Sequence, residues 1–526
     1  MIAGIFICVA EDIVMIDRAN RQYRLSEEDF VLFDQLLPYD HVLQDFHNQI
    51  DWLAIAGKLE QFFSPNMGRP GIPPIYLIKM EFLRYYYRLS DVEVFERCRT
   101  DIAFRWFLQL PMRSEPPDAT TLCKFRARIG QEGFQQVFDQ IIQQARDAGL
   151  VKDRLRLKDA SHVIASIAIP TSLQLLAQLR DRLLKEIAVI DPLMAKGFEV
   201  SSEQARQETS QSDVAVRLEK RVLLLRDILS WIDKFEPKDP QAPAWQRLQI
   251  TRRLAETILS NQTDPDASDK ILSLVDIEAR RGMHGEWFEG YKVDMLVDAD
   301  SELITQINVI SASGNEALNA VTLVKAEQEA FGNQIETISI DRAGYDGAMI
   351  RELEDPQKTN VQVIVPPKRI PDTKLFTPEE FVVSEDGEQA TCPAGAQSIR
   401  RNEEIGGRRI RFTFSKETCA SCPLLSRCMK QLPKGRMGRA VSKNEYEAEY
   451  ARIALRATTD EFSKVRKEHP IVERKFTETL NRHGGRRTPY RGKAKTTAHE
   501  LMAAVATNVK RMVKLLLAGA VCHMPT

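Results

Sequence analysis

The feature that most constrains the fold is a regular alternation of strand and helix patterns between Trp287 and Pro366. Two segments with alternating apolar residues, FEGYKVDMLVDAD and ELITQINVI, predict a hairpin with its turn at Asp298–Ser301. A helical pattern then runs to Gly332, and the strand IETISI, the helix GAMIRELED and the strand VQVIVP follow. This β-β-α-β-α-β order predicts an α/β fold in which helices pack on a mixed sheet.

An earlier strand pattern at residues 154–168 belongs to the same predicted sheet, and long insertions interrupt it. A chain of 526 residues is too long for one compact core, so several domains are expected. One insertion reads as long amphipathic helices, separated by the polar stretch SSEQARQETSQSD, and the other is rich in Cys. The predicted boundaries are 151–170 with 281–370 and 461–526 for the α/β core, 171–280 for the helical insertion, and 371–460 for the Cys-rich insertion.

The first 150 residues read as mostly helical. In residues 1–65 we expect a short strand pair followed by helices, and MIAGIFICVA lacks the basic start of a signal peptide. In residues 66–150, capped helix starts at Asp91 and Asp118 lead into a basic helix. This pattern suits a DNA-binding module of the helix-turn-helix type, and the alternative is a helical packing or dimerisation domain.

Charge is distributed unevenly although the net charge is only −1. From Lys464 to Lys514, Lys and Arg outnumber Asp and Glu several-fold, which predicts either a nucleic-acid surface or a solvated face. No run of about 18 uncharged apolar residues is present, so we expect no membrane span and a cytoplasmic location. Eight Cys, four of them clustered, fit a reducing compartment better than a disulfide scaffold.

Three carboxylates occupy positions that suit metal-dependent phosphodiester chemistry. Asp341 ends the strand IETISI, Asp159 lies inside the strand LRLKDASHVIASIAI, and Glu473 follows Val472 in the helix PIVERKFTETL. Two Mg²⁺ ions held by Asp and Glu oxygens activate the nucleophile and balance charge on the attacking and leaving oxygens. A short Asp fixed by a sheet suits the bridging role, so Asp159 is the predicted bridge and Asp341 holds one ion.

Other interpretations of these acids remain open. Each is also compatible with a structural role, as a turn residue or an exposed helix acid. Further candidate acids are Asp276, Asp294 and Asp298, and spacing alone does not choose among them.

The motifs together resemble bacterial insertion-sequence DDE transposases, specifically the group labelled IS-eleven-eighty-two. KDASHVIAS resembles the strand of the family's first Asp, IDRAGYDG its second-Asp motif, and HPIVERKFTETLNRHGG its Glu helix. RPGIPPIYLIKMEFLRYYYRLS with PDATTLCKFRARIG resembles the N-terminal helical domain, and the likeness covers nearly the whole chain. Two departures are Ala160-Ser161 before His162, and Leu480 where the family often has Lys.

The resemblance implies an RNase H-like catalytic core, with Asp159, Asp341 and Glu473 holding two Mg²⁺ or Mn²⁺ ions. It implies that water cleaves DNA at the transposon ends and that the freed 3′-OH attacks target DNA. A homodimer is expected because two ends must be synapsed, and the protein is expected to associate with the nucleoid. The competing hypotheses are an inactive or domesticated copy that only binds DNA, and a nuclease that performs no strand transfer.

Four clustered cysteines predict a structural zinc site. Cys392, Cys419, Cys422 and Cys428 give C-x26-C-x2-C-x5-C, and four thiolates suit tetrahedral Zn²⁺. The alternative is a set of reduced, partly buried thiols.

Basic residues near the predicted active site and in the N-terminal domain are the expected DNA contacts. They are Arg466, Arg482, Arg486, Arg487, Arg491, Lys493, Lys124 and Arg126. Tyr490, in the same basic segment, is suited either to base stacking or to packing.

Overall fold

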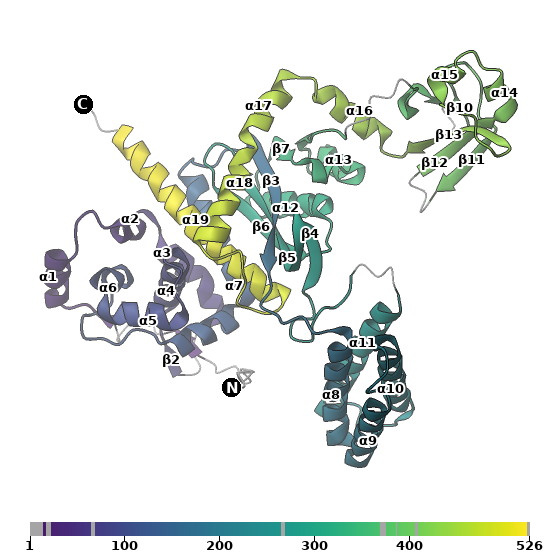
Figure 1. Cartoon of the computed structure of the whole chain (residues 1–526). Coiled ribbons are helices and arrows are strands. Elements are labelled where there is room, and N and C mark those ends of the chain that lie inside the picture. The colour runs from purple at the N-terminus through teal and green to yellow at the C-terminus, as the bar shows by residue number, and fades with distance from the viewer. Residues whose placement is uncertain are drawn as a thin grey trace. The chain divides into compact units, whose positions relative to one another are not determined.

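The structure is a computed structural model, in which the chain is described at 14–16, 23–64, 69–264, 269–368, 375–384, 387–404 and 409–522 (Figure 1). The segment MIAGIFICVA lies outside these residues. The chain divides into two compact units. The first comprises Met1–Lys152, Asp159–Asn315 and Val472–Thr526, and the second comprises Asp153–Lys158 and Glu316–Ile471. No helix in the described ranges is long and apolar enough to cross a membrane.

The N-terminal part of the first unit is helical, as predicted. Its helices are α1 (Glu27–Leu36), α2 (Val42–Gln49), α3 (Trp52–Leu59), α4 (Pro74–Tyr86), α5 (Asp91–Thr100), α6 (Ile102–Leu108) and α7 (Ala119–Asp147). The Asp118 carboxylate accepts from Thr121 N at 2.6 Å, which confirms the predicted cap. The helix that follows is longer than expected, because it continues through a kink at Gly130 (φ 56°). The strand pair expected in residues 1–65 lies largely outside the described residues; the strand described there, β1 (Val14–Ile16), pairs with β2 (Arg69–Gly71).

The first unit also contains the antiparallel strands of the sheet. They are β4 (Arg280–His284), β5 (Glu286–Asp298) and β6 (Ile304–Ser311), and β5 lies between β4 and β3 (Leu155–Ile164). Strands β5 and β6 form the predicted hairpin, whose turn is closed by Ser301 N donating to Asp298 Oδ2 at 2.9 Å. Strand β4 was not predicted, because RRGMH has no apolar alternation. The long helix α19 (Lys493–Cys522) packs on β6, α4 and α7.

The helical insertion is built as predicted, with one correction. Its helices are α8 (Ser172–Ile190), α9 (Pro192–Glu208), α10 (Val214–Lys234) and α11 (Pro243–Thr263), and they share one apolar core (Figure 1). The polar stretch at 201–213 is not simply a separator, because α9 continues through it to Glu208. Apolar residues at helical spacing, such as Leu179, Leu183 and Ile187, place α8 on the core.

The second unit contains the parallel part of the sheet. Residues 155–158 of β3, β7 (Thr337–Ile340) and β8 (Gln362–Ile364) run parallel, and the helices are α12 (Glu316–Phe331), α13 (Gly347–Glu354), α16 (Glu447–Arg456) and α17 (Asp460–Glu468). Gly332 ends α12 at φ 63°, as predicted. The chain thus shows the predicted β-β-α-β-α-β order from β5 to β8.

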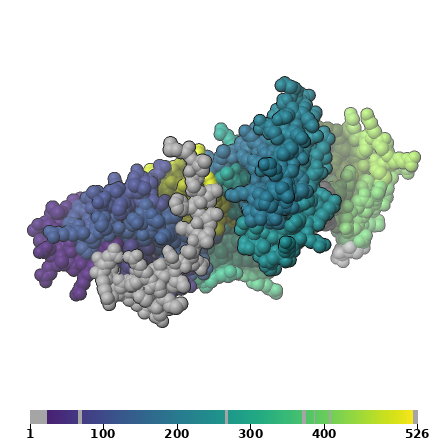
Figure 2. Space-filling view, turned by 90° about the horizontal axis from the view of Figure 1, so that it is seen from below, coloured from purple at the N-terminus to yellow at the C-terminus, as the bar shows by residue number. Residues whose placement is uncertain are grey.

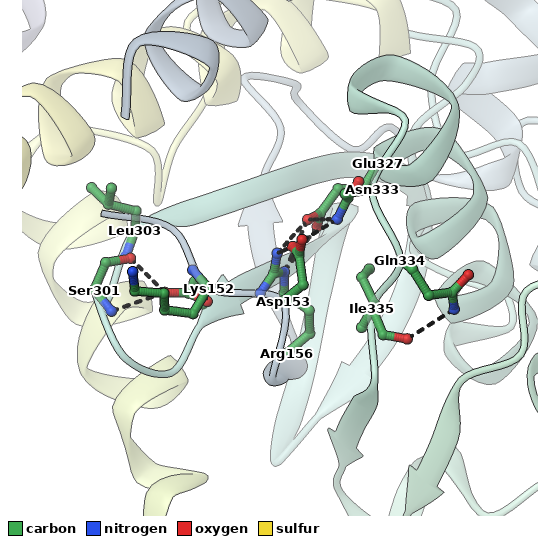
Figure 3. A network of polar contacts seen from close by, with 10 residues as sticks. Lys152, Asp153, Arg156, Ser301, Leu303, Glu327, Asn333, Gln334 and Ile335 are labelled. Carbon is green, nitrogen blue, oxygen red and sulfur yellow. Dashed lines mark hydrogen bonds and ion pairs between the residues drawn. The ribbon is translucent and has the colours of Figure 1, made fainter. Parts of the chain in front are cut away.

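A buried ion pair attaches β3 to α12 within this unit. Arg156 Nη2 lies 2.7 Å from Glu327 Oε1 and 2.9 Å from Asp153 Oδ1, and Figure 3 shows the three side chains converging with Asn333. Neither Arg156 nor Glu327 has exposed side-chain surface. Because the charges are paired, strand β3 can carry an arginine into the interior.

The Cys-rich segment of the second unit has its own small core. Its strands are β9 (Val382–Val383), β10 (Ala390–Thr391), β11 (Arg400–Glu404), β12 (Arg409–Ser415) and β13 (Met437–Asn444), with the short helices α14 (Lys416–Ala420) and α15 (Leu425–Cys428). Strands β11, β12 and β13 form an antiparallel sheet, which packs Phe412, Phe414 and Val441 against Phe381.

Candidate active site

Asp341 stands where β7 ends. All four residues of β7 are buried, and Asp341 itself is half-buried. Its Oδ1 accepts from Gly344 N at 3.2 Å, which closes a tight turn. A Cβ on Gly344 would lie 2.4 Å from Cγ2 of Ile340, so the turn requires glycine. Asp341 therefore has the structural role of a turn residue, which the sequence also allowed. The bond from Gly344 N fixes its carboxylate at the end of the strand.

The residues around the end of β7 include a cation that the sequence singled out. Arg466 Nη1 donates to the Ile340 carbonyl at 2.9 Å and lies 3.2 Å from Ser339 Oγ. His469 Nδ1 lies 3.1 Å from the same hydroxyl. Burial, together with the charges of Arg466 and Lys158, lowers the pKa of His469 to about 4, so the ring is neutral at pH 7. Arg466 is thus the positive charge next to the strand end that precedes Asp341.

Asp159 follows the segment of β3 that pairs with β7. In this parallel pairing Lys158 lies opposite Ile340. Each of these two residues is followed in the chain by one of the predicted acids, Asp159 and Asp341. Asp159 is half-buried, and its Oδ1 accepts from the neighbouring Ala160 N at 2.8 Å. The strand pairing thus has matched positions directly before both acids.

The loop after α18 (Pro470–Phe476) docks along the second half of β3. Ile164 N donates to the Arg486 carbonyl at 3.0 Å, and Thr488 N donates to the Ile164 carbonyl at 3.1 Å. The Arg486 side chain donates to Ser161 Oγ at 3.1 Å and to the His162 carbonyl at 2.8 Å. Burial lowers the pKa of Arg486, although the group stays charged at pH 7. Arg486 therefore holds the strand of Asp159 and has fewer donors left for DNA.

Glu473 lies on the exposed side of its helix. Val472, Phe476 and Leu480 are buried at 0 %, 5 % and 1 % exposure, which confirms the predicted apolar stripe. A π-helical turn, Thr477–Arg482, follows α18.

The rival acids are engaged inside the first unit. Asp298 is fully buried and accepts from both Ser301 N and Ser301 Oγ. Asp276 accepts from Tyr291 Oη at 2.7 Å and from Gly492 N at 3.0 Å. Asp294 is fully buried. These positions suit structural acids, whereas Asp159, Asp341 and Glu473 all keep exposed surface.

The predicted DNA-binding residues fall into two groups. Five are exposed on the first unit: Lys124, Arg482, Arg487, Arg491 and Lys493. Arg126 is different, because Nη1 donates to Glu81 at 2.6 Å and to Asp91 at 3.0 Å. Tyr490, considered for base stacking, is half-buried, and its Oη accepts from Arg84 Nη2 at 3.1 Å. Local sequence patterns do not indicate the contact between Arg84 and Tyr490, because it joins residues 406 positions apart.

The four clustered cysteines line one pocket of about 230 Å³ in the second unit. All four are half-buried free thiols. Burial raises the pKa of Cys428, and the other three thiols act in the same direction, whereas Arg439 opposes them. In the described part of the chain, no group of three or more His, Cys, Asp or Glu is arranged to hold a metal ion.

Two segments match known protein families. Residues 31–128 match the family described as a transposase domain, and residues 391–513, which include Glu473, match the family described as a transposase DDE domain. The two matched segments together support an insertion-sequence DDE transposase.

One curated protein is also similar to part of the chain. The uncharacterized protein ORF8 in the nfe locus of Rhizobium meliloti is 26 % identical over 105 residues, which are 20 % of this chain and 50 % of that protein. The chain thus spans about half the length of the curated relative that it matches.

Proposed function

We propose that this protein binds the ends of an insertion sequence, cleaves phosphodiesters there and joins the freed 3′ ends to target DNA. The observation that carries the proposal is the parallel register of β3 and β7, in which Lys158 lies opposite Ile340. Carboxylates that directly follow matched positions of neighbouring parallel strands are suited to share a pair of divalent ions. Asp159 and Asp341 are those carboxylates, and Glu473 is the third. An RNase H-like core and membership of the IS-eleven-eighty-two group are part of the proposal.

The three acids fit Mg²⁺ or Mn²⁺ by their donor type. Carboxylate oxygens are the ligands that these hard cations prefer, and bound ions would stabilise charge on the attacking and leaving oxygens. Asp159 is the proposed bridging ligand. The chain's own part is to fix the acids: Gly344 N holds Asp341, while Arg486 secures the strand of Asp159. Arg466 supplies positive charge beside the Ile340 carbonyl, where a phosphate would be attracted.

The exposed basic residues are the proposed contacts with the DNA backbone. They are Lys124, Arg482, Arg487, Arg491 and Lys493. Arg126 and Arg486 are assigned positioning roles, because their guanidinium groups are bonded within the fold, whereas Arg466 is the proposed contact with a phosphate near Asp341. We assign recognition of the element ends to residues 66–150, and a homodimer to the complex that holds two ends together. A nucleoid-associated location follows from DNA binding.

We propose that Cys392, Cys419, Cys422 and Cys428 bind a structural Zn²⁺. They line one pocket, and thiolates are the ligands that zinc prefers. Zinc would stabilise a segment whose apolar core is small. Metal analysis of the purified protein and of Cys419→Ser tests this, and equal zinc content in both would contradict the proposal.

The catalytic proposal is tested with a DNA fragment that carries the native element ends and Mg²⁺. Asp341→Asn keeps the turn-closing acceptor but removes the charge, so cleavage should fall at least a hundredfold while DNA binding persists. Glu461→Gln, an exposed acid of α17, is the matched control and should cleave normally. Cleavage by Asp341→Asn at the wild-type rate would overturn the assignment. Cleavage without joined products would identify a nuclease, and binding without cleavage would identify a DNA-binding copy.

A further inference from the structure

The surface of the helical insertion carries a cluster of arginines that its fold does not require. The core of α8–α11 is formed by apolar residues such as Leu183, Leu225 and Ile258. Three arginines from α9 and α10 line a hollow of about 650 Å³ outside that core: Arg206, Arg217 and Arg221. Figure 2 shows the outer surface of this segment in dark teal. The hollow is therefore a surface feature of the insertion.

The arginines of this cluster bring positive charges close together. Repulsion from Arg180, Arg217 and Arg206, after burial as the largest cause, lowers the pKa of Arg221. Arg217 and Arg221 are four residues apart on α10, a spacing at which like charges destabilise a helix. Four guanidinium groups from three helices thus lie close enough to repel one another.

The counter-charges in the cluster are fewer than the cations. Arg180 pairs with Asp181 at 2.5 Å, and Arg206 lies 3.7 Å from Glu203. Arg221 Nη1 donates to the Leu173 carbonyl at 3.1 Å, which neutralises no charge. Among the described residues no ion-pair partner is found for Arg217.

Three other basic residues of the insertion contrast with this cluster, because each lies beside an acid. Lys220 lies 3.3 Å from Glu208, Arg247 lies 2.9 Å from Glu186, and Arg252 lies 2.7 Å from Asp233.

The hollow has the chemistry of a phosphate site. Its lining adds Gln207, Thr209 and Ser210, whose amide and hydroxyl groups donate to phosphate oxygens. A second hollow shares Glu203 with the first, but its lining sets Asp181 and Glu199 against Arg180 and Lys185, so the excess of positive charge belongs to the first hollow. Neither lining contains an aromatic side chain that would stack on a base. This favours contact with a backbone over recognition of a nucleotide base.

We propose that the helical insertion binds the phosphate backbone of DNA through Arg206, Arg217 and Arg221. The proposal rests on the proposed DNA transposition, and it gives the insertion a role of its own: an additional, sequence-independent grip on DNA. Such contacts release counterions, so they contribute directly to the salt dependence of binding.

The test measures the Kd of the full-length protein for an element-end fragment and for an unrelated fragment over a range of salt concentrations. Arg206→Gln/Arg217→Gln should weaken binding to both fragments equally. It should also reduce the slope of log Kd against log salt by about two, one for each lost phosphate contact. Its thermal midpoint should stay unchanged or rise slightly, because like-charge repulsion is relieved.

The matched control is Arg226→Gln. Arg226 is exposed on α10 and lies nine residues after Arg217, about 180° around the helix. This variant should keep the wild-type slope. A double variant that binds with the wild-type slope would overturn the inference and leave the proposed function standing. A wild-type protein that binds neither fragment would overturn both.

Discussion

Removing the charge of Arg156 should destabilise the second unit by about 3–5 kcal/mol, the usual cost of breaking a buried ion pair from one side. Arg156→Met keeps much of the side-chain length but leaves the Glu327 carboxylate buried without its guanidinium. Glu327 Oε1 now receives 2.7 Å and 2.9 Å bonds from Nη2 and Nε. The variant loses both of these bonds, so we expect a loss of about 4 kcal/mol, roughly a thousandfold in the unfolding equilibrium.

A second substitution separates this cost from a general packing defect. In Arg156→Met/Glu327→Leu no buried charge is left unpaired in this couple, and apolar replacement of both partners is often neutral or stabilising. Asp153, the other partner of Arg156, retains 33 % side-chain exposure and is solvated by water. The double variant should therefore be more stable than Arg156→Met, so the two substitutions should show strong coupling.

The assay must report on the second unit. All five tryptophans lie outside Glu316–Ile471, so their fluorescence would follow the other unit. Native-state hydrogen exchange, read on peptides that contain residues 153–158 and 337–340, measures opening of the β3–β7 pair directly. A loss below about 1 kcal/mol in Arg156→Met, or effects that simply add in the double variant, would refute the reasoning.

Three further outcomes follow from single sites. Gly344→Ala places a Cβ 2.4 Å from Ile340 Cγ2, so it should cost about 1–3 kcal/mol and reduce DNA cleavage more than DNA binding. The folded-state pKa of His469 is about 4 against an ordinary 6.5; stability should therefore fall as pH drops from about 6.5 to 4, and His469→Asn should flatten the pH dependence of the urea midpoint. Arg126→Gln removes bonds to the buried Glu81, so it should lower stability by about 2 kcal/mol yet leave the salt slope of DNA binding unchanged; a reduced slope would make Arg126 a DNA contact.

Local patterns predicted the elements that surround the candidate acids. Apolar alternation predicted strand β7 and the β5–β6 hairpin, and helical spacing predicted the helices of the insertion. The residue types at the turns predicted that Asp298 lies in the hairpin turn and that Gly332 ends α12. Each of these signals lies within a few residues of the feature that it predicts, because backbone preferences and side-chain periodicity are local.

The partners of the basic residues were not predictable in this way. Arg486 is bonded to Ser161 Oγ across 325 positions of sequence, and Arg126 to Glu81 across 45. A guanidinium in a basic run has the same local pattern whether it faces solvent or an internal carboxylate. Only the tertiary fold therefore divides the eight predicted DNA contacts into exposed and internally bonded groups.

Burial explains how this chain accommodates Leu480, where the resemblance predicts a lysine. Leu480 follows Phe476 by four residues and Val472 by eight, so helical spacing places it beside the buried stripe of this helix. It is 1 % exposed, and the neighbouring Thr479 is 0 % exposed. A lysine at this position would have to bring its ammonium group to the surface past that core, whereas the leucine packs within it.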